Sequence, residues 1–193
     1  PAGEALARQT RARLERLETA APRRVALATR SALVLRDADL LTRLDAHHAV
    51  SVAVHLSALD PALSRRLEGD GDAPAARLEA AADLAARGLS VTVVLSPLLP
   101  GINDGKEQLR GLLAAARRAG ARDVAAESWP LPPWGRGRLL ARLAAEAPHL
   151  APLYRHLYTA IGRVRREEER RLTERFERFR LAAGFPRAWV GRG

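Results

Sequence analysis

The sequence contains no cysteine and no methionine. Without thiolates, the chain by itself cannot form disulfides, use a cysteine nucleophile, or bind zinc or an iron–sulfur cluster through sulfur. It also lacks the run of about 20 apolar residues that a membrane-spanning helix needs, so we expect a soluble, cytoplasmic protein without a membrane partner. The sequence starts with Pro1 rather than methionine, which suggests a fragment or a processed chain.

Lysine is almost absent, because Lys106 is the single lysine among 32 basic residues. The formal net charge is +10, which is a common property of proteins that bind nucleic acid. GC-rich coding offers another explanation, since it favours arginine and alanine over lysine. We prefer that explanation, and a nucleic-acid partner stays an alternative.

Apolar runs alternate with amphipathic stretches along the first two thirds of the chain. The runs Val25–Thr29, Val50–Leu56, Leu89–Leu95 and Arg122–Ala126 are predicted strands. The stretches Glu4–Glu18, Ala75–Arg87 and Lys106–Ala119 are predicted helices, and Asp37 and Asp60 are expected to cap two more. This alternation is typical of an α/β fold with parallel strands and right-handed crossovers.

The composition changes after Ser128. The segment SWPLPPWGRG, residues 128–137, is rich in proline and has no hydrophobic period, so it is a predicted connector. Gly137–Glu146 and Ala151–Ala183 follow as predicted helices. We therefore expect a βα region over residues 1–128, and a connector with C-terminal helices over residues 129–193.

The stretch Leu89–Asp104, LSVTVVLSPLLPGIND, joins a predicted buried strand to a loop that cannot continue it. Pro97 and Pro100 lack the N–H group that a central strand donates, and Gly101 favours a turn. Barrels and open parallel sheets bind ligands at this end of their strands.

Several stretches resemble, in the same order, the radical S-adenosylmethionine (SAM) superfamily, in the branch related to spore photoproduct lyase. Residues 95–104, LSPLLPGIND, resemble its Ala-Pro-(Ile/Val)-(Ile/Leu)-Pro-Gly-(Leu/Ile)-Asn-Asp loop. Residues 29–37, TRSALVLRD, are similar to its Thr-Lys-Ser segment with the following apolar run and Arg-Asp. Residues 52–60, VAVHLSALD, resemble a strand that carries serine in the family, and residues 67–79 resemble its Leu-Glu-Pro-Arg…Arg-Leu-Glu pattern.

The resemblance implies a partial TIM-type (βα) barrel with parallel strands, followed by C-terminal helices. It also implies reductive cleavage of SAM at a [4Fe–4S] cluster, giving a 5′-deoxyadenosyl radical that abstracts a substrate hydrogen. The first strands and the Cys-x-x-x-Cys-x-x-Cys loop of the family have no counterpart here. The cluster ligands are therefore expected in a missing N-terminal segment or a companion chain, or they have been lost. No metal ligand or catalytic residue is assigned in this chain.

The resemblance implies that SAM lies near the ends of the strands. The implied SAM-binding residues are Thr29, Arg30, Ser31, His55, Ser96 and Asn103. This sequence departs from the family where His55 replaces a serine, Arg30 replaces a lysine and Asp70 stands in place of an arginine. Arg30 keeps a positive charge for a carboxylate, His55 can still donate a hydrogen bond, and Asp70 reverses the sign.

Four of the implied SAM-binding residues also have a structural interpretation. His55 could be a core histidine with satisfied hydrogen bonds, Thr29 and Ser31 could cap a turn or helix, and Asn103 could form an Asx turn. At the level of function, we expect the C-terminal part of a radical SAM enzyme with an unidentified substrate. The alternatives are a cluster-free pseudoenzyme that serves as a binding scaffold, and a basic nucleic-acid-associated protein.

Overall fold

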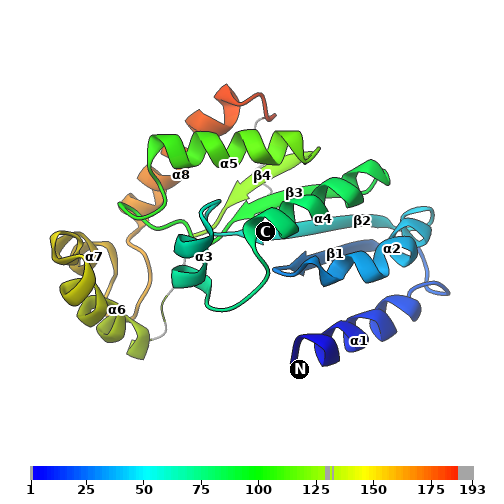
Figure 1. The fold of residues 1–193 in the computed structure, drawn as a ribbon, viewed down its shortest axis with the longest axis horizontal. Coiled ribbons are helices and arrows are strands. Elements are labelled where there is room, and N and C mark those ends of the chain that lie inside the picture. The colour runs from blue at the N-terminus through cyan, green and yellow to red at the C-terminus, as the bar shows by residue number, and fades with distance from the viewer. Residues whose placement is uncertain (1, 129–130, 132, 187–193) are drawn as a thin grey trace.

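The computed structural model describes residues 2–128, 131 and 133–186. It has an α/β fold around a parallel sheet in the order β1-β2-β3-β4. The strands are β1 (Arg24–Thr29), β2 (Ala49–Leu56), β3 (Ser90–Leu95) and β4 (Asp123–Ala126), all close to the predicted bounds. The predicted α/β class with parallel strands is confirmed (Figure 1). None of the described helices is long and apolar enough to cross a membrane.

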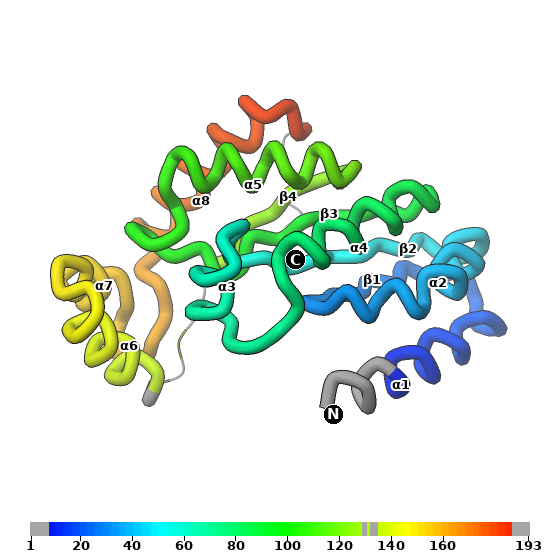
Figure 2. Tube along the Cα trace, viewed as in Figure 1, coloured from blue at the N-terminus to red at the C-terminus, as the bar shows by residue number. Residues whose placement is uncertain are grey.

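Helices connect each strand to the next. The connecting elements are the 3-10 helix η1 (Ala32–Asp37) with α2 (Ala38–Asp45), then α3 (Pro61–Glu68) with α4 (Pro74–Ala86), then α5 (Lys106–Arg118). Helix α1 (Ala2–Glu15) precedes β1 and packs against α2 and η1. Figure 2 follows the described chain from α1 to the last helix, α8 (Arg166–Ala182), at the β4 side.

The main core lies between the sheet and these helices. Alternate residues such as Val52 and Val91 are buried against Leu41 and Leu84. A second cluster joins Val93 and Val124 to α5 and to two phenylalanines, Phe176 and Phe185, near the C-terminal end of the described chain. Helix α8 therefore packs against the same face of the sheet as the connecting helices. In Figure 1, α2, α4 and α5 lie in front of the sheet.

The predicted cap at Asp60 is confirmed, because its carboxylate accepts a hydrogen bond from the Leu63 N–H at 2.6 Å. The predicted cap at Asp37 is wrong. The chain is already helical in η1 when it reaches α2, and Asp37 makes no capping hydrogen bond. Its carboxylate instead accepts a hydrogen bond from the Arg11 guanidinium of α1 at 2.8 Å. This contact links α1 to the end of η1.

The predicted helix Ala151–Ala183 is two helices, α7 (Ala151–Leu157) and α8. Between them Gly162 has a φ of 77°, and a Cβ there would collide with the Leu131 carbonyl oxygen. The Leu131 N–H donates to the Gly162 carbonyl at 2.8 Å, so this turn holds the residue that precedes α6. Helical periodicity could not reveal this break, because the apolar pattern continues through it.

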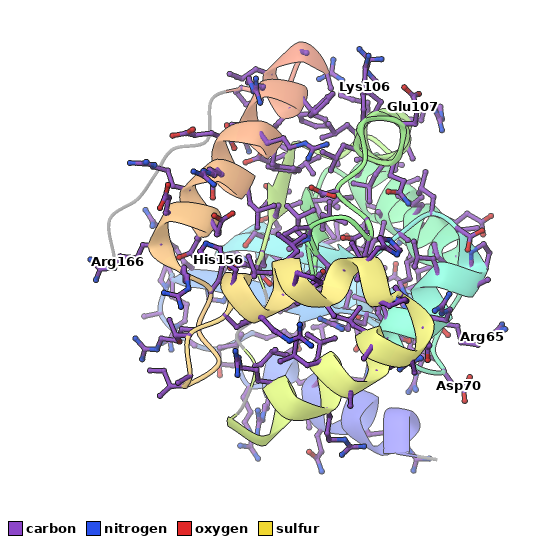
Figure 3. The ribbon with its side chains drawn as sticks, turned by 90° about the vertical axis from the view of Figure 1, so that its left-hand side faces the viewer. Arg65, Asp70, Lys106, Glu107, His156 and Arg166 are labelled. Atoms are coloured by element: carbon purple, nitrogen blue, oxygen red, sulfur yellow. The ribbon has the colours of Figure 1, made fainter. Side chains whose placement is uncertain are left out.

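Helix α6 (Pro133–Glu146) starts within the predicted connector, whose residues 129, 130 and 132 lie outside the described part. A 3-10 turn, η2 (Pro148–Leu150), joins α6 to α7. The two helices bury Leu143 and Tyr154 against Leu99. The Tyr154 hydroxyl donates to the Pro100 carbonyl at 3.0 Å. Helices α6 and α7 therefore pack against the loop between β3 and α5. Figure 3 views the structure from the side of these two helices.

Candidate functional site

The strands end together at one edge of the sheet, because every neighbouring pair is parallel. In Figure 1 this edge faces α3 and the α6–α7 pair. The loops after Thr29, Leu56, Leu95 and Ala126 leave from here and carry most of the predicted site residues. Ligands of parallel α/β folds bind at this end of the strands, which makes it the candidate site.

In the part of the chain that the structure describes, helices cover one face of the sheet and leave the other face open. In β2, Val52 and Val54 are buried against the helices, whereas Ser51, Ala53 and His55 are only half-buried. By register, the same face continues through Ala26, Ala28, Thr92, Val94 and Ala125, of which Val94 is buried. Most of these side chains are small, so they form a shallow floor. Parallel sheets are normally covered on both faces, whereas the described helices cover only the other face of this sheet.

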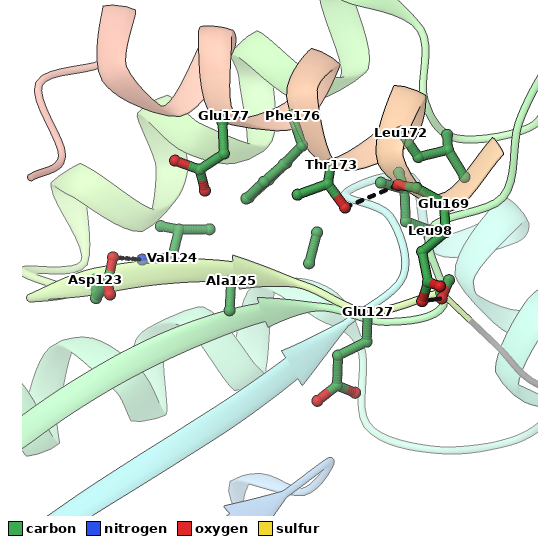
Figure 4. A pocket seen from close by; sticks show the side chains of 12 residues that line it. Leu98, Asp123, Val124, Ala125, Glu127, Glu169, Leu172, Thr173, Phe176 and Glu177 are labelled. Carbon is green, nitrogen blue, oxygen red and sulfur yellow. Dashed lines mark hydrogen bonds between the residues drawn. The ribbon is translucent and has the colours of Figure 1, made fainter. Parts of the chain in front are cut away.

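His55 and Glu127 stand over the carboxyl end of this floor. His55 Nδ1 lies 4.0 Å from Glu127 Oε2, and the exposed fractions of the side chains are 15% and 57%. Figure 4 shows Ala125 and Glu127 pointing away from α8, toward the open face. Nδ1 of His55 is buried and has no hydrogen-bond partner within the described chain. His55 is thus not a core histidine with satisfied hydrogen bonds.

The pKa of His55 is lowered from its ordinary value of 6.5. Burial is the main cause, and the charges of Arg30 and Arg77 add to it, while Glu127 and Glu68 act in the opposite direction. At neutral pH the imidazole is therefore uncharged, with one nitrogen able to donate and the other able to accept. Sequence reasoning missed Glu127, although its position directly after the last predicted strand was a usable signal.

Arg30 lies beside a buried ion pair. Its Nη1 is 3.8 Å from Glu68 Oε2, and the Arg30 side chain is 52% exposed. Glu68 is itself paired with Arg77, with 2.6 Å between Oε2 and Nη1. Burial alone would raise the pKa of Glu68, but hydrogen bonds from Ser57 and Arg77 and the charge of Arg77 outweigh it and lower that pKa. The result is one carboxylate between two guanidinium groups, of which only Arg30 reaches solvent.

Thr29 and Ser31 hold the turn after β1. The Ser31 N–H donates to the Thr29 hydroxyl oxygen at 3.0 Å. The Ser31 hydroxyl accepts from the Leu33 N–H and donates to the Asp72 carboxylate at 2.7 Å. Ser31 thereby caps η1, and Asp72 links the turn to the segment before α4. Both residues are at the predicted edge, with their hydroxyls engaged in the capping interactions that were the structural interpretation.

Ser96 and Asn103 lie inside the loop between β3 and α5. Ser96 is buried, and its N–H donates to the Leu56 carbonyl at 2.9 Å. The Asn103 amide nitrogen donates to the carbonyls of Ser57 and Pro97, each at 2.7 Å. Its oxygen accepts from the Leu99 N–H at 2.7 Å. Asn103 fixes the loop, and its polar atoms are used there rather than on the open face.

The structure therefore divides the predicted site residues into two groups. Arg30 and His55 meet at the open edge together with Glu68 and Glu127, whereas the others hold the surrounding turns. Asp70, the position of reversed charge, is fully exposed 3.9 Å from Arg65 and lies outside this group (Figure 3). In the described part of the chain, no three histidine or acidic side chains gather closely enough to hold a metal ion.

A separate cleft of about 760 Å³ lies between β4 and α8 (Figure 4). Three of its four acidic lining residues have partners on this side, since Asp123 and Glu177 pair with Arg180 and Glu169 accepts from the Ser128 hydroxyl; the fourth is Glu127. Arg180 is fully buried, and its Nε donates to the Val124 carbonyl at 2.7 Å on the outer side of β4. The cleft is thus part of the packing interface between α8 and β4.

Comparison with known proteins gives relatives without an assigned activity. The chain is 35% identical over 134 residues to the uncharacterized proteins Rv2578c of Mycobacterium tuberculosis and Mb2609c of Mycobacterium bovis. The match covers 69% of this chain and 39% of each relative. The chain thus spans about two fifths of the length of these relatives. No protein-family model matches it.

Proposed function

We propose that this chain forms the later units of a partial (βα) barrel in a radical SAM enzyme. The observation that carries the proposal is the parallel sheet with helices on one face and an open floor of small side chains on the other. In (βα) barrels the helices lie outside, the strands enclose the centre, and the site lies at the carboxyl ends of the strands. His55, Arg30 and Glu127 stand at that end.

This chain's own residues do not fit the iron–sulfur cluster. The sequence has no cysteine, and the described residues include no alternative ligand group. In a radical SAM enzyme the cluster ligands would then come from a segment outside this chain or from a companion chain. This agrees with the small share of the mycobacterial relatives that the chain spans.

The open edge does fit parts of SAM. The exposed guanidinium of Arg30 can bind the carboxylate of the amino-acid moiety, and the carboxylate of Glu127 can face its ammonium group. The unpartnered Nδ1 of His55 can meet a polar group of the ligand. The small side chains of the floor leave room for the nucleoside. A reduced cluster held outside this chain would supply the electron that cleaves SAM, and this chain's contribution would be to bind and orient SAM.

Isothermal titration of SAM into the complete protein tests the proposal. A charge-assisted hydrogen bond contributes about 1.5–3 kcal/mol, so Arg30→Ala should weaken SAM binding roughly tenfold to a hundredfold. The matched control is Arg166→Ala, because Arg166 is an exposed arginine at the start of α8, labelled in Figure 3. Equal effects of the two substitutions, or no binding of SAM by the intact protein, would show that the assignment is wrong.

A cluster-free binding scaffold is the second candidate. Glu68 already lies 3.8 Å from Arg30 and partly neutralises the charge proposed for the SAM carboxylate. Iron and sulfide analysis of the complete protein after anaerobic reconstitution separates the two candidates. A stoichiometric cluster favours the enzyme, and a protein that binds SAM without a cluster favours the scaffold.

A further inference from the structure

A second hollow lies on the helix side of the layer, between α5 and α8. Its volume is about 880 Å³. The lining side chains are apolar or cationic, and they are Lys106, Arg110, Leu113, Ala114, Arg117, Arg118, Arg175, Arg178, Phe179, Ala182 and Ala183. The lining residues belong to α5, α8 and the adjoining Ala183 and include none of the strand residues, so the hollow is separate from the open face of the sheet.

The charge of this hollow has one sign. Six of its lining residues are basic and none is acidic. Arg110 and Arg175 have acidic partners outside the lining, at 3.7 Å from Glu107 and 2.8 Å from Asp104. Within the described part of the chain, Lys106, Arg118 and Arg178 form no ion pair. These three cations are therefore free to pair with an anionic partner. A partner that covers them must supply such a charge, because burying an unpaired cation is costly.

The floor of the hollow consists of apolar side chains, most of them alanine. Ala114 and Ala182 are exposed, and Phe179 is half-buried with the Arg110 guanidinium 6.0 Å from its ring centre. Alanine side chains leave space for the backbone and side chains of another molecule. An apolar centre surrounded by charged residues is the usual composition of a protein-binding surface.

We propose that this hollow docks an acidic peptide segment of a protein partner, with a large apolar side chain on the floor and carboxylates against the surrounding cations. The cations select a polyanion, and the apolar floor selects a peptide over a nucleic acid. A phosphate backbone is contacted by hydrogen-bond donors and cations rather than by alanine, and the lining offers a single aromatic side chain, Phe179, on which a base could stack. The proposal is independent of SAM binding.

Fluorescence polarisation with the 193-residue chain tests the proposal. The probe is a short labelled peptide in which glutamate alternates with leucine and phenylalanine. One comparison probe replaces the leucine and phenylalanine by serine, and another is an oligothymidylate of equal charge. We expect the first peptide to bind most tightly. Tighter binding of the oligothymidylate, equal binding of the serine peptide, or no binding of the first peptide would overturn the proposal.

Two variants locate the binding site. The triple variant Lys106→Gln, Arg118→Gln, Arg178→Gln should bind the peptide about tenfold more weakly. The control triple variant carries the same charge change at exposed arginines elsewhere, and it is Arg13→Gln, Arg16→Gln, Arg166→Gln. Ala114→Glu places a negative charge on the floor, where it repels the carboxylates of the peptide, and should also weaken binding. The same substitution at Ala12 on α1 should not. Circular dichroism confirms that each variant is folded. Equal losses in the variants and their controls would place the peptide elsewhere and overturn the proposal.

Discussion

Nη1 of Arg77 lies 2.6 Å from Oε2 of Glu68, and both side chains are 3% exposed. The same arginine donates to the His55 carbonyl at 3.1 Å, and Glu68 accepts from the Ser57 N–H at 2.9 Å. The pair therefore joins α3 and α4 to the end of β2, directly beneath the candidate site. A buried ion pair adds little net stability, but breaking it leaves an uncompensated charge.

Replacing one partner of this pair should therefore be more harmful than replacing both. Arg77→Met should lower the free energy of unfolding by about 3–5 kcal/mol, because Glu68 is left buried without Arg77. The double variant Arg77→Met, Glu68→Leu should recover much of this loss. Urea denaturation measures both, with Arg65→Met on the exposed side of α3 as the control. A double variant as unstable as the sum of its single changes would contradict the prediction.

The stability conferred by Glu68 should depend on pH. The pKa of Glu68 is lowered in the folded chain, so its contribution is complete above the unfolded value near 4.5 and is lost as the pH falls toward the folded pKa. The difference in unfolding free energy between the wild type and Glu68→Gln should be largest near neutral pH. It should shrink below about pH 4.5. Urea titrations across this range make the comparison, and a difference that stays constant with pH would refute the assignment.

The imidazole of His55 should report the charges around the open edge. Its pKa is lowered chiefly by burial, while Glu127 raises it and Arg30 lowers it. Glu127→Gln should therefore lower the pKa of His55 further, and Arg30→Gln should raise it. Titration of the imidazole resonances by NMR measures both shifts. Glu174→Gln on the exposed part of α8 is the control and should leave the His55 pKa unchanged. Shifts in the same direction for both variants would mean that His55 does not face these groups.

Arg180 should be essential for holding α8 against β4. It is fully buried, donates to the Val124 carbonyl and pairs with Asp123 and Glu177. Arg180→Met removes these contacts and should destabilise the protein by at least about 2–3 kcal/mol. Arg178→Met, two residues away and exposed, should stay within about 0.5 kcal/mol. Chemical denaturation followed by circular dichroism tests the pair, and equal losses would contradict the structural role of Arg180.

Local patterns predicted the strands well, because a run such as Val50–Leu56 places its larger apolar side chains at every second residue, which is the period of a strand. The order of the helices and the cap at Asp60 follow from the same short-range rules. Local rules were insufficient at Asp37 and Gly162. The residue before α2 is engaged by Arg11, which lies 26 positions away, and Gly162 turns the chain because it meets the Leu131 backbone.

The sequence by itself determined the α/β class, the parallel strands and the presence of Arg30 and His55 near the strand ends. These features depend on hydrophobic period and turn chemistry over a few residues. Only the tertiary structure decided that Asn103 fixes a loop, that Glu68 lies between Arg30 and Arg77, and that Glu127 approaches His55. Such contacts join segments far apart in the chain, and their geometry depends on how the strands and helices pack. The same reason applies to the basic hollow, since its cations come from α5 and α8 and gather only when those helices meet.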